Sequence, residues 1–515
     1  MAFIPIRQIG AGGIVTDQAP YDLELQQFPD GNNVAIEDGK IGKALGYSSR
    51  QALSFEPTHV QGWLYQGNNT LIIGGNTGLY RFDGTTVSDV SKTGGYSNSP
   101  RWQSAQIGTA VLMNNGTETP QYMLPDGTAF ADLPAWPTNV ITGCIKPFNS
   151  FLVMVGYEEL TSRYPFTVRW SDEYDPAGVP GSYDITSTTN LSGENVLSGQ
   201  SGELVDQLTL NDANIIYAER GVYAMTFIGA PLVFAFREIF TDDGIINRGA
   251  VAGFFGQHLV VGQNDIYVHD GNNKRSIVDK RVRRQFFAEL RDTRSVFCQT
   301  IPDRSEVWIC YADDDSSDSQ TANRALVYNW AQDAFTFIDL PNVRALTLAD
   351  KMDTSGDWDN SPVTWAQSSD YWSNASITTA GQNIKLFGAG YLDDKVYQHN
   401  DTYGADGSAL DAYVEASKLD LDAITGGSTS TIKQINQILP QIEGSGSLTI
   451  KVGVSESPQQ GVQWIAERDY NIESDHKIDV RASGRYLALR FESASSEDWW
   501  KVTGLDIDIR EVAKR

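Results

Sequence analysis

Short apolar runs followed by glycine or asparagine turns recur along the chain before residue 400. Residues 71–84 and 259–271 repeat one unit: an apolar strand, a turn, an alternating strand and an Asp-Gly turn. Weaker copies occur at 215–223 and 386–401. Alternation of apolar and polar positions is typical of strands. Repeats spaced by roughly 40 to 50 residues have the size of a four-stranded propeller blade.

This repeat predicts an all-β chain in which residues 58–400 form a β-propeller of about six or seven blades. One four-stranded sheet cannot bury both of its faces, whereas a ring of sheets buries each face against the next. Residues 350–381 contain few apolar runs and are expected to form an inserted loop. The alternative interpretation is a chance succession of apolar triplets, which any all-β chain contains.

The pattern changes after residue 400. A Gly/Ser-rich segment precedes strictly alternating runs at 448–452, 486–491 and 505–509. Such alternation is typical of antiparallel sheets with one face exposed, so residues 401–515 are expected to form a β-sandwich. Residues 1–57 contain turn sequences but little periodicity, and an extended arm with a short hairpin is expected there.

One segment, residues 279–291, has the pattern of a helix. Apolar residues recur there at every fourth position from Val282, which places them on one face. Arginines lie beside this stripe, and we expect Arg281, Arg283 and Arg284 to contact a neighbouring subunit. The alternative is a connecting helix whose arginines are solvated or pair with acidic residues of the same chain.

The net charge narrows the possible functions. The chain has 39 Lys and Arg residues against 65 Asp and Glu, a formal charge of −26. That balance argues against a basic nucleic-acid binder, which needs clustered positive charge for its phosphate contacts. Three cysteines are too few for a disulfide scaffold, and we expect free buried thiols. The start of the sequence contains no secretory signal and no apolar run is long enough to cross a bilayer, so assembly in a cytoplasm without stable membrane insertion is expected.

A search for catalytic motifs finds little. P-loop, dinucleotide-binding, zinc-protease and serine-hydrolase motifs are absent from the sequence. The histidines are far apart in sequence and encode no local metal pair, and His269 and His399 occupy equivalent repeat positions that favour a structural role. Acidic pairs such as Glu158-Glu159 could suggest a glycosidase, but the decisive carboxylate separation cannot be read from a sequence. We therefore expect a protein that is not an enzyme, with no catalytic residue, cofactor or metal.

Several segments of the sequence resemble structural proteins of short-tailed bacteriophages, the tail nozzle or tail tubular protein B group. The resemblance extends over nearly the whole chain, although each matching segment is a short structural segment and not a motif of catalytic or binding residues. These segments are residues 9–17, 19–23, 30–34, 38–40, 169–172, 280–283, 323–330, 339–341, 485–491 and 503–508.

The resemblance implies a virion protein of the phage tail, assembled in the host cytoplasm. Such a subunit contains a β-propeller and forms a ring of about six copies. The ring lies below the portal and adaptor and above a needle or fibre protein, and genomic DNA passes through it during ejection. No catalytic residue carries over. An acidic wall would agree with this role, because it would repel phosphate and keep the DNA from adhering.

Two other functions stay open. A receptor- or glycan-binding tail module would use the Trp- and Asn-rich residues 358–372. A propeller-type hydrolase would cleave a surface polysaccharide and would lose activity on substitution of a catalytic Glu or Asp.

Overall fold

The computed structural model describes residues 3–65, 68–97, 101–197, 199–350, 384–419 and 431–514. Strands make up 58% of the chain and helices 4%, which confirms the expected all-β class. The expected inserted loop and the Trp- and Asn-rich residues 358–372 lie outside the described residues. No helix in the described ranges is long and apolar enough to span a bilayer.

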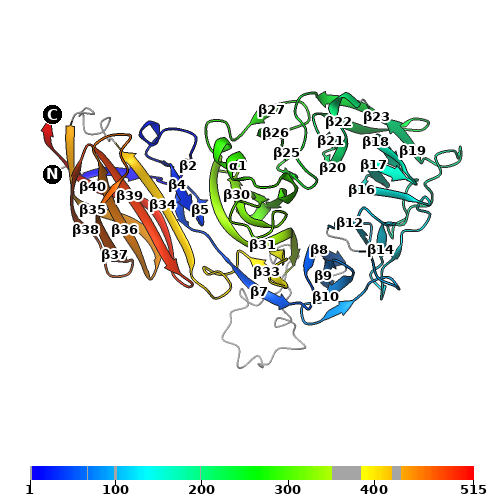
Figure 1. Ribbon diagram of the computed structural model, residues 1–515, viewed down its shortest axis with the longest axis horizontal. Helices are drawn as coiled ribbons and strands as arrows, with labels where there is room; N and C mark the ends of the chain where they lie inside the picture. Colours follow the sequence, from blue (N-terminus) through cyan, green and yellow to red (C-terminus); the bar gives the residue numbers. More distant parts are fainter. Residues whose placement is uncertain are drawn as a thin grey trace, which may run out of the picture.

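Five antiparallel sheets of four strands follow one another along the described part of the chain (Figure 1). The first contains β8 (Pro57–Tyr65), β9 (Asn68–Gly75), β10 (Leu79–Phe82) and β11 (Val87–Asp89). The second contains β12 (Gln103–Ile107), β13 (Ala110–Asn114), β14 (Gln121–Met123) and β15 (Ala131–Asp132). The third contains β16 (Val140–Phe148), β17 (Phe151–Glu159), β18 (Ser162–Trp170) and β19 (Gly193–Val196).

The fourth and fifth sheets repeat the same strand order. The fourth contains β20 (Leu204–Leu210), β21 (Ala213–Ala218), β22 (Val222–Gly229) and β23 (Val233–Phe240). The fifth contains β24 (Val251–Phe254), β25 (Gln257–Val261), β26 (Ile266–His269) and β27 (Lys274–Ser276). The two repeat units noted in the sequence therefore coincide with β9–β10 and β25–β26.

A sheet of seven strands follows, and it divides into two groups of four that share one strand. Its strands, in order, are β28 (Phe297–Ile301), β29 (Glu306–Tyr311), β30 (Ala322–Asn329), β31 (Ala334–Asp350), β32 (Ile384–Gly390), β33 (Lys395–His399) and β7 (Tyr47–Ala52). The long strand β31 pairs with β30 in its first half and with β32 in its second half. The last strand of the second group, β7, comes from the N-terminal part of the chain and pairs with β33.

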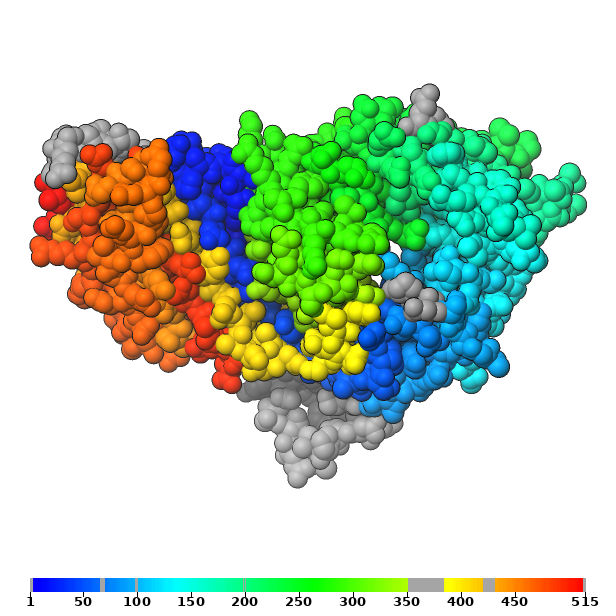
Figure 2. All heavy atoms as spheres, in the orientation of Figure 1, coloured from blue at the N-terminus to red at the C-terminus, as the bar shows by residue number. Residues whose placement is uncertain are grey.

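The first strands of these groups lie next to one another around a shared centre (Figure 1). Strand β12 contacts β8 and β16, and each later first strand contacts the next, until the second half of β31 contacts β8. Figure 2 shows an opening among these parts of the molecule. Separate apolar cores fill the spaces between neighbouring groups. Phe387 of β32, for example, packs with Leu71 and Phe82 of the first sheet.

Two further sheets face each other at the other end of the molecule (Figure 1). One contains β38 (Ile478–Gly484), β35 (Thr431–Ser445), β40 (Trp499–Lys514), β6 (Lys40–Lys43), β5 (Val34–Glu37) and β1 (Phe3–Arg7). The other contains β37 (Gln463–Asn471), β36 (Ser447–Ser455), β39 (Tyr486–Ser495), β34 (Leu410–Leu419) and β4 (Asp30–Asn32). Buried side chains of both sheets, such as Ile435 and Phe491, share one core.

The N-terminal residues, which were expected to form an extended arm, belong largely to sheets. The expected short hairpin exists as β5 and β6, but it continues the sheet of β40, and β1 pairs with β40 as well. A short parallel pair, β2 (Gly13–Ile14) and β3 (Gln27–Phe28), lies between these strands in sequence. Strand edges carry unpaired backbone N–H and C=O groups, so incorporation of these strands satisfies the edges of the C-terminal sheets. The domain boundaries at residues 57 and 400 stay predictions.

The helix α1 (Arg283–Glu289) lies within the segment that the sequence predicts to be helical, but it is shorter than the thirteen residues considered. Val282 and Phe286 are fully buried, as the apolar stripe requires. Four 3-10 turns complete the described elements: η1 (Pro20–Asp22), η2 (Gly199–Ser201), η3 (Thr293–Ser295) and η4 (Pro302–Arg304). The turn η4 joins β28 to β29, and Cys298 and Cys310 contribute to different cores on the two faces of that pair. Both thiols are free.

Candidate functional site

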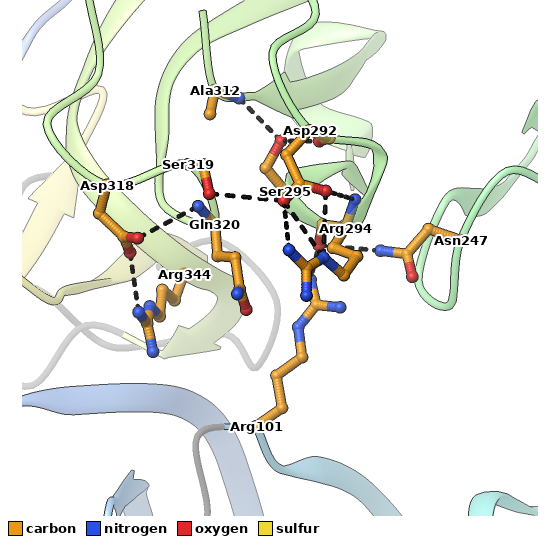
Figure 3. A network of polar contacts seen from close by, with 10 residues as sticks. All are labelled: Arg101, Asn247, Asp292, Arg294, Ser295, Ala312, Asp318, Ser319, Gln320 and Arg344. Atoms are coloured by element: carbon orange, nitrogen blue, oxygen red, sulfur yellow. Dashed lines mark hydrogen bonds and ion pairs between the residues drawn. The ribbon is translucent and has the colours of Figure 1, made fainter.

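Four arginines from distant parts of the sequence gather near the beginnings of the inner strands. Arg101 precedes β12, Arg248 precedes β24, Arg294 lies in η3 before β28, and Arg344 lies in β31. We call them the arginine cluster. The guanidinium of Arg101 donates to the backbone carbonyl of Arg294, which also accepts from the Asn247 amide at 3.0 Å (Figure 3). The Arg101 side chain thus joins segments 193 positions apart in sequence.

Two aspartates neutralise part of the cluster. Asp292 pairs with Arg294 at 2.8 Å, and hydrogen bonding to Arg294 holds the pKa of Asp292 below its usual value. Asp318 pairs with Arg344 at 2.8 Å (Figure 3). The Arg344 guanidinium also stacks 3.3 Å from the ring centre of Tyr391. Burial works against ionisation of Asp318, but bonds from Thr321 and Arg344 outweigh it and lower its pKa. Arg294 and Arg344 are therefore held by the protein itself.

Arg101 and Arg248 lack such neutralisation. Among the described residues, no carboxylate lies within 4.0 Å of either guanidinium. Burial, together with the nearby charges of Arg248 and Arg344, lowers the pKa of Arg101 to about 10. A guanidinium carries a positive charge in proteins, so this region is positive in an otherwise acidic protein.

An ion pair lies beside Arg248 and connects the third sheet to the fourth. Lys146 of β16 and Asp206 of β20 are 2.7 Å apart, and the Asp206 side chain is fully buried. Asp206 also accepts from the backbone N–H groups of Gln207 and Gly249 and from the thiol of Cys144. Burial would raise the pKa of Asp206, but Lys146 and these bonds lower it. Asp206 is thus an occupied structural anion, and burial raises the pKa of Cys144 to about 12.

A cavity of about 320 Å³ opens next to this ion pair. It extends from the β13–β14 turn across β16, β17 and β18 to the start of β20. Three glycines contribute only backbone atoms to its wall: Gly116, Gly143 and Gly156. Its polar lining consists of Asn115, Tyr157, Glu158, Arg163, Glu203 and Arg248.

The carboxylates of this cavity belong to one ionic group. Arg163 binds Glu158 at 3.0 Å and Glu203 at 3.1 Å. Glu158 belongs to the acidic pair that raised the possibility of glycosidase chemistry. Its bond to Arg163 gives it a structural partner that the sequence did not indicate.

His258, His269 and His399 lie inside the fold, whereas His476 is exposed. Tyr217 of β21 contacts His258 Nδ1 at 2.7 Å and His269 Nε2 at 2.8 Å, between the fourth and fifth sheets. Burial lowers the pKa of His258 to about 4 and that of His269 to about 3. His399 of β33 is buried as well, and its pKa falls to about 3. Across the ranges that the structure describes, no group of three or more His, Cys, Asp and Glu side chains could hold a metal ion.

The three arginines expected at a subunit contact have different surroundings. Arg281 pairs with Asp333 at 2.7 Å, and Arg283 donates to the backbone carbonyl of Asn264 at 2.7 Å. Arg284 is exposed, and only its backbone N–H binds Asp17. Arg284 is consequently the best placed of the three for a contact with another molecule, and the subunit contact itself stays a prediction.

No sequence pattern points to the arginine cluster, Lys146 or Asp206. Each is a single charged residue in a segment without a motif, and only the packing of the sheets brings them together. No family model matches this chain, and no curated protein matches it.

Proposed function

We propose that the chain is a structural subunit of a phage tail, one copy of a ring through which genomic DNA leaves the virion. The sequence segments that resemble tail nozzle or tail tubular protein B-like proteins support this proposal. So does an all-β body in which ion pairs such as Lys146–Asp206 and Arg281–Asp333 join parts of the chain that are distant in sequence.

The same proposal assigns the first large part of the chain to a seven-bladed β-propeller. Five blades are the separate four-stranded sheets, and two are the halves of the seven-stranded sheet. The observation that carries this assignment is the origin of β7. A strand from before the first blade pairs with β33 and completes the last blade. In a closed ring, such a strand joins the two ends of the chain and removes a free sheet edge.

A closed ring of sheets would resist deformation, as a subunit in the wall of a DNA channel must. Every blade buries both faces against its neighbours, so no blade can move without disturbing two apolar cores. Strands β1, β5 and β6 connect residues near the N-terminus to the C-terminal sheets in the same way. The excess of acidic residues would oppose adhesion of DNA to the assembled wall.

Negative-stain electron microscopy of the purified protein and of the virion tests the function. We expect rings of about six copies, since closed symmetric rings are the usual product of a head-to-tail contact. Binding to a tail adaptor on one side and to a needle or fibre protein on the other is expected as well. A protein that stays monomeric at high concentration and is missing from the virion would contradict the proposal.

The alternative function, a propeller-type hydrolase, is tested with the same purified protein. Clearance of a capsular polysaccharide by the purified protein, lost on substitution of Glu158 or Glu203, would replace the structural function by an enzymatic one.

A further inference from the structure

The cavity beside Arg248 has the chemistry of a binding site that the structural function does not require. We propose that it binds a sugar acid, with the carboxylate on Arg248 and the hydroxyl groups on the acidic side of the cavity. The proposal goes beyond the function in the preceding subsection and does not depend on it.

The guanidinium of Arg248 has hydrogen-bond donors that no group of the described chain uses. Its Nε atom is buried and has no hydrogen-bond partner. Within the described ranges, none of the side chains or carbonyl groups accepts a hydrogen bond from this guanidinium, and no carboxylate lies within 4.0 Å of it. A guanidinium presents five N–H donors in a planar fork that matches a carboxylate. Arg248 is partly exposed and lines the cavity, so its unused donors are available to an anion from outside the chain.

Asp206, which accepts from the backbone N–H of the residue after Arg248, already has its own partners. Asp206 accepts from Lys146, from Cys144 and from the N–H groups of Gln207 and Gly249. The other charges near Arg248 are positive: Arg101 and Lys146 both interact with it electrostatically. The electrostatic potential at the Arg248 end of the cavity therefore favours a negative group from outside the chain.

The backbone preserves room for the guanidinium. A Cβ atom on Gly143 would collide with one Nη atom of Arg248. Around Gly116, in contrast, a Cβ atom would have no neighbour closer than 3.6 Å, which is ordinary van der Waals contact. The position of Arg248 thus requires glycine at 143.

The opposite side of the cavity has hydrogen-bond acceptors. Glu158 and Glu203 are bridged by Arg163, and each carboxylate has capacity for further donors because it can accept about four hydrogen bonds. Hydroxyl groups are suitable donors. A second anionic group would be repelled there.

These features select the class of ligand. Uronic and sialic acids carry one anionic group and several hydroxyls on the same molecule. A free phosphate would occupy only the Arg248 end of the cavity. The cavity volume of about 320 Å³ lies at the lower end of the range for small-ligand sites, which suits one or two sugar rings.

Ligand-observed NMR and isothermal titration calorimetry on the full chain test the proposal. The probes are glucuronic acid and N-acetylneuraminic acid, with glucose as the neutral sugar and inorganic phosphate as the simple anion. We expect both sugar acids to bind, and glucose and phosphate to bind at least about tenfold more weakly, because each retains only part of the contacts.

Two variants locate the site. Arg248→Met and Gly143→Ala should each weaken sugar-acid binding by about tenfold or more, the first by removing the guanidinium and the second by displacing it. Arg248→Lys should restore part of the affinity, since the charge returns without the planar fork. Arg468→Met is the matched control, because Arg468 is exposed on β37 in the C-terminal sheets. Circular dichroism melting identifies any variant that fails to fold.

The proposal would be overturned if neither sugar acid bound at millimolar concentration, if glucose bound equally well, or if binding were unchanged in a folded Arg248→Met protein. Phosphate that binds as tightly as the sugar acids would also refute it, since the acidic side of the cavity would then contribute nothing. Negative-stain images of the same preparations record ring formation separately, so a failure of sugar binding is distinguishable from a failure of the structural function.

Discussion

Lys146 and Asp206 form an ion pair of 2.7 Å that connects the first strands of two consecutive sheets. The pair lies where β16 contacts β20, near the centre around which the sheets are arranged (Figure 1). An anion at this depth persists because a lysine, a thiol and two backbone N–H groups surround it. It therefore connects one sheet to the next by charge, in addition to the apolar core between them.

Removal of one partner should destabilise the protein strongly. Lys146→Met leaves the buried Asp206 carboxylate without its counter-charge, which costs about 3–5 kcal/mol in comparable buried pairs. Urea unfolding followed by fluorescence measures the loss. The exposed pair of Lys477 and Asp479 is the control, and Lys477→Met should leave the unfolding midpoint unchanged. A Lys146→Met protein as stable as the parent would show that Asp206 is satisfied by its other partners.

The contact between β32 and the first sheet should be equally sensitive. Phe387 is fully buried between β32 and the first sheet, so Phe387→Ala opens a cavity there. Comparable truncations cost about 3–5 kcal/mol. Phe255→Ala, at a position that is 90% exposed, is the matched control and should change the free energy of unfolding little. Limited proteolysis should cut the Phe387→Ala protein faster. Equal protease resistance would indicate that this contact does not hold the first and last groups together.

Acid should destabilise the fold through its buried histidines. The pKa of His258 is lowered to about 4 and that of His399 to about 3, against about 6.5 in an unfolded chain. Above pH 6.5, the histidines are neutral in both states and contribute no pH dependence. As the pH falls from 6.5 toward 4, the unfolded chain binds protons that the folded chain does not. Each such histidine then lowers the free energy of unfolding by up to about 1.4 kcal/mol per pH unit.

His399→Leu separates this effect from the titration of carboxylates. His399 has a buried Nε2 atom with no hydrogen-bond partner among the described groups, so leucine removes a titrating group without breaking a known bond. Melting temperatures between pH 7 and pH 4.5 should fall less steeply in this variant than in the parent. Parallel curves would mean that His399 is protonated in the folded protein or that other groups dominate the acid response.

Substitution of Arg284 should affect assembly without affecting folding. Arg284 is exposed on α1 and its guanidinium has no carboxylate within 4.0 Å in the described part of the chain, whereas Arg281 already binds Asp333. We expect Arg284→Glu to reduce ring formation in sedimentation velocity, because a contact that uses this arginine would then carry the wrong charge. Arg468→Glu serves as the control for a charge reversal at an exposed site. Normal rings with Arg284→Glu would place the subunit contact elsewhere.

Local features of the fold could be predicted from the sequence because they depend on neighbouring residues. The repeat units at 71–84 and 259–271 became the strand pairs β9–β10 and β25–β26. Side chains alternate along strands, and Cys298 and Cys310 accordingly belong to two separate cores on opposite faces of the β28–β29 pair. The apolar spacing from Val282 located α1, although the helix is shorter than the pattern.

Long-range pairing could not be read in the same way. Strand β31 belongs to two four-stranded groups because its partner changes from β30 to β32 partway along its length, near Pro341 and Asn342, and the sequence does not say which strand each half pairs with. Strand β7 follows the N-terminal strands in sequence but pairs with β33, more than three hundred residues later. Backbone hydrogen bonds are the same for every residue type, so the choice of partner depends on which faces are buried together.

The sequence by itself therefore determined the all-β class, the strand-turn-strand unit, the free thiols and the acidic charge, because each follows from residue type and local period. Only the tertiary structure decided that Arg248 faces a cavity without a counter-ion while Asp206 is fully paired. Charged side chains far apart in sequence interact according to their separation and burial, and both quantities are set by how the sheets pack against one another.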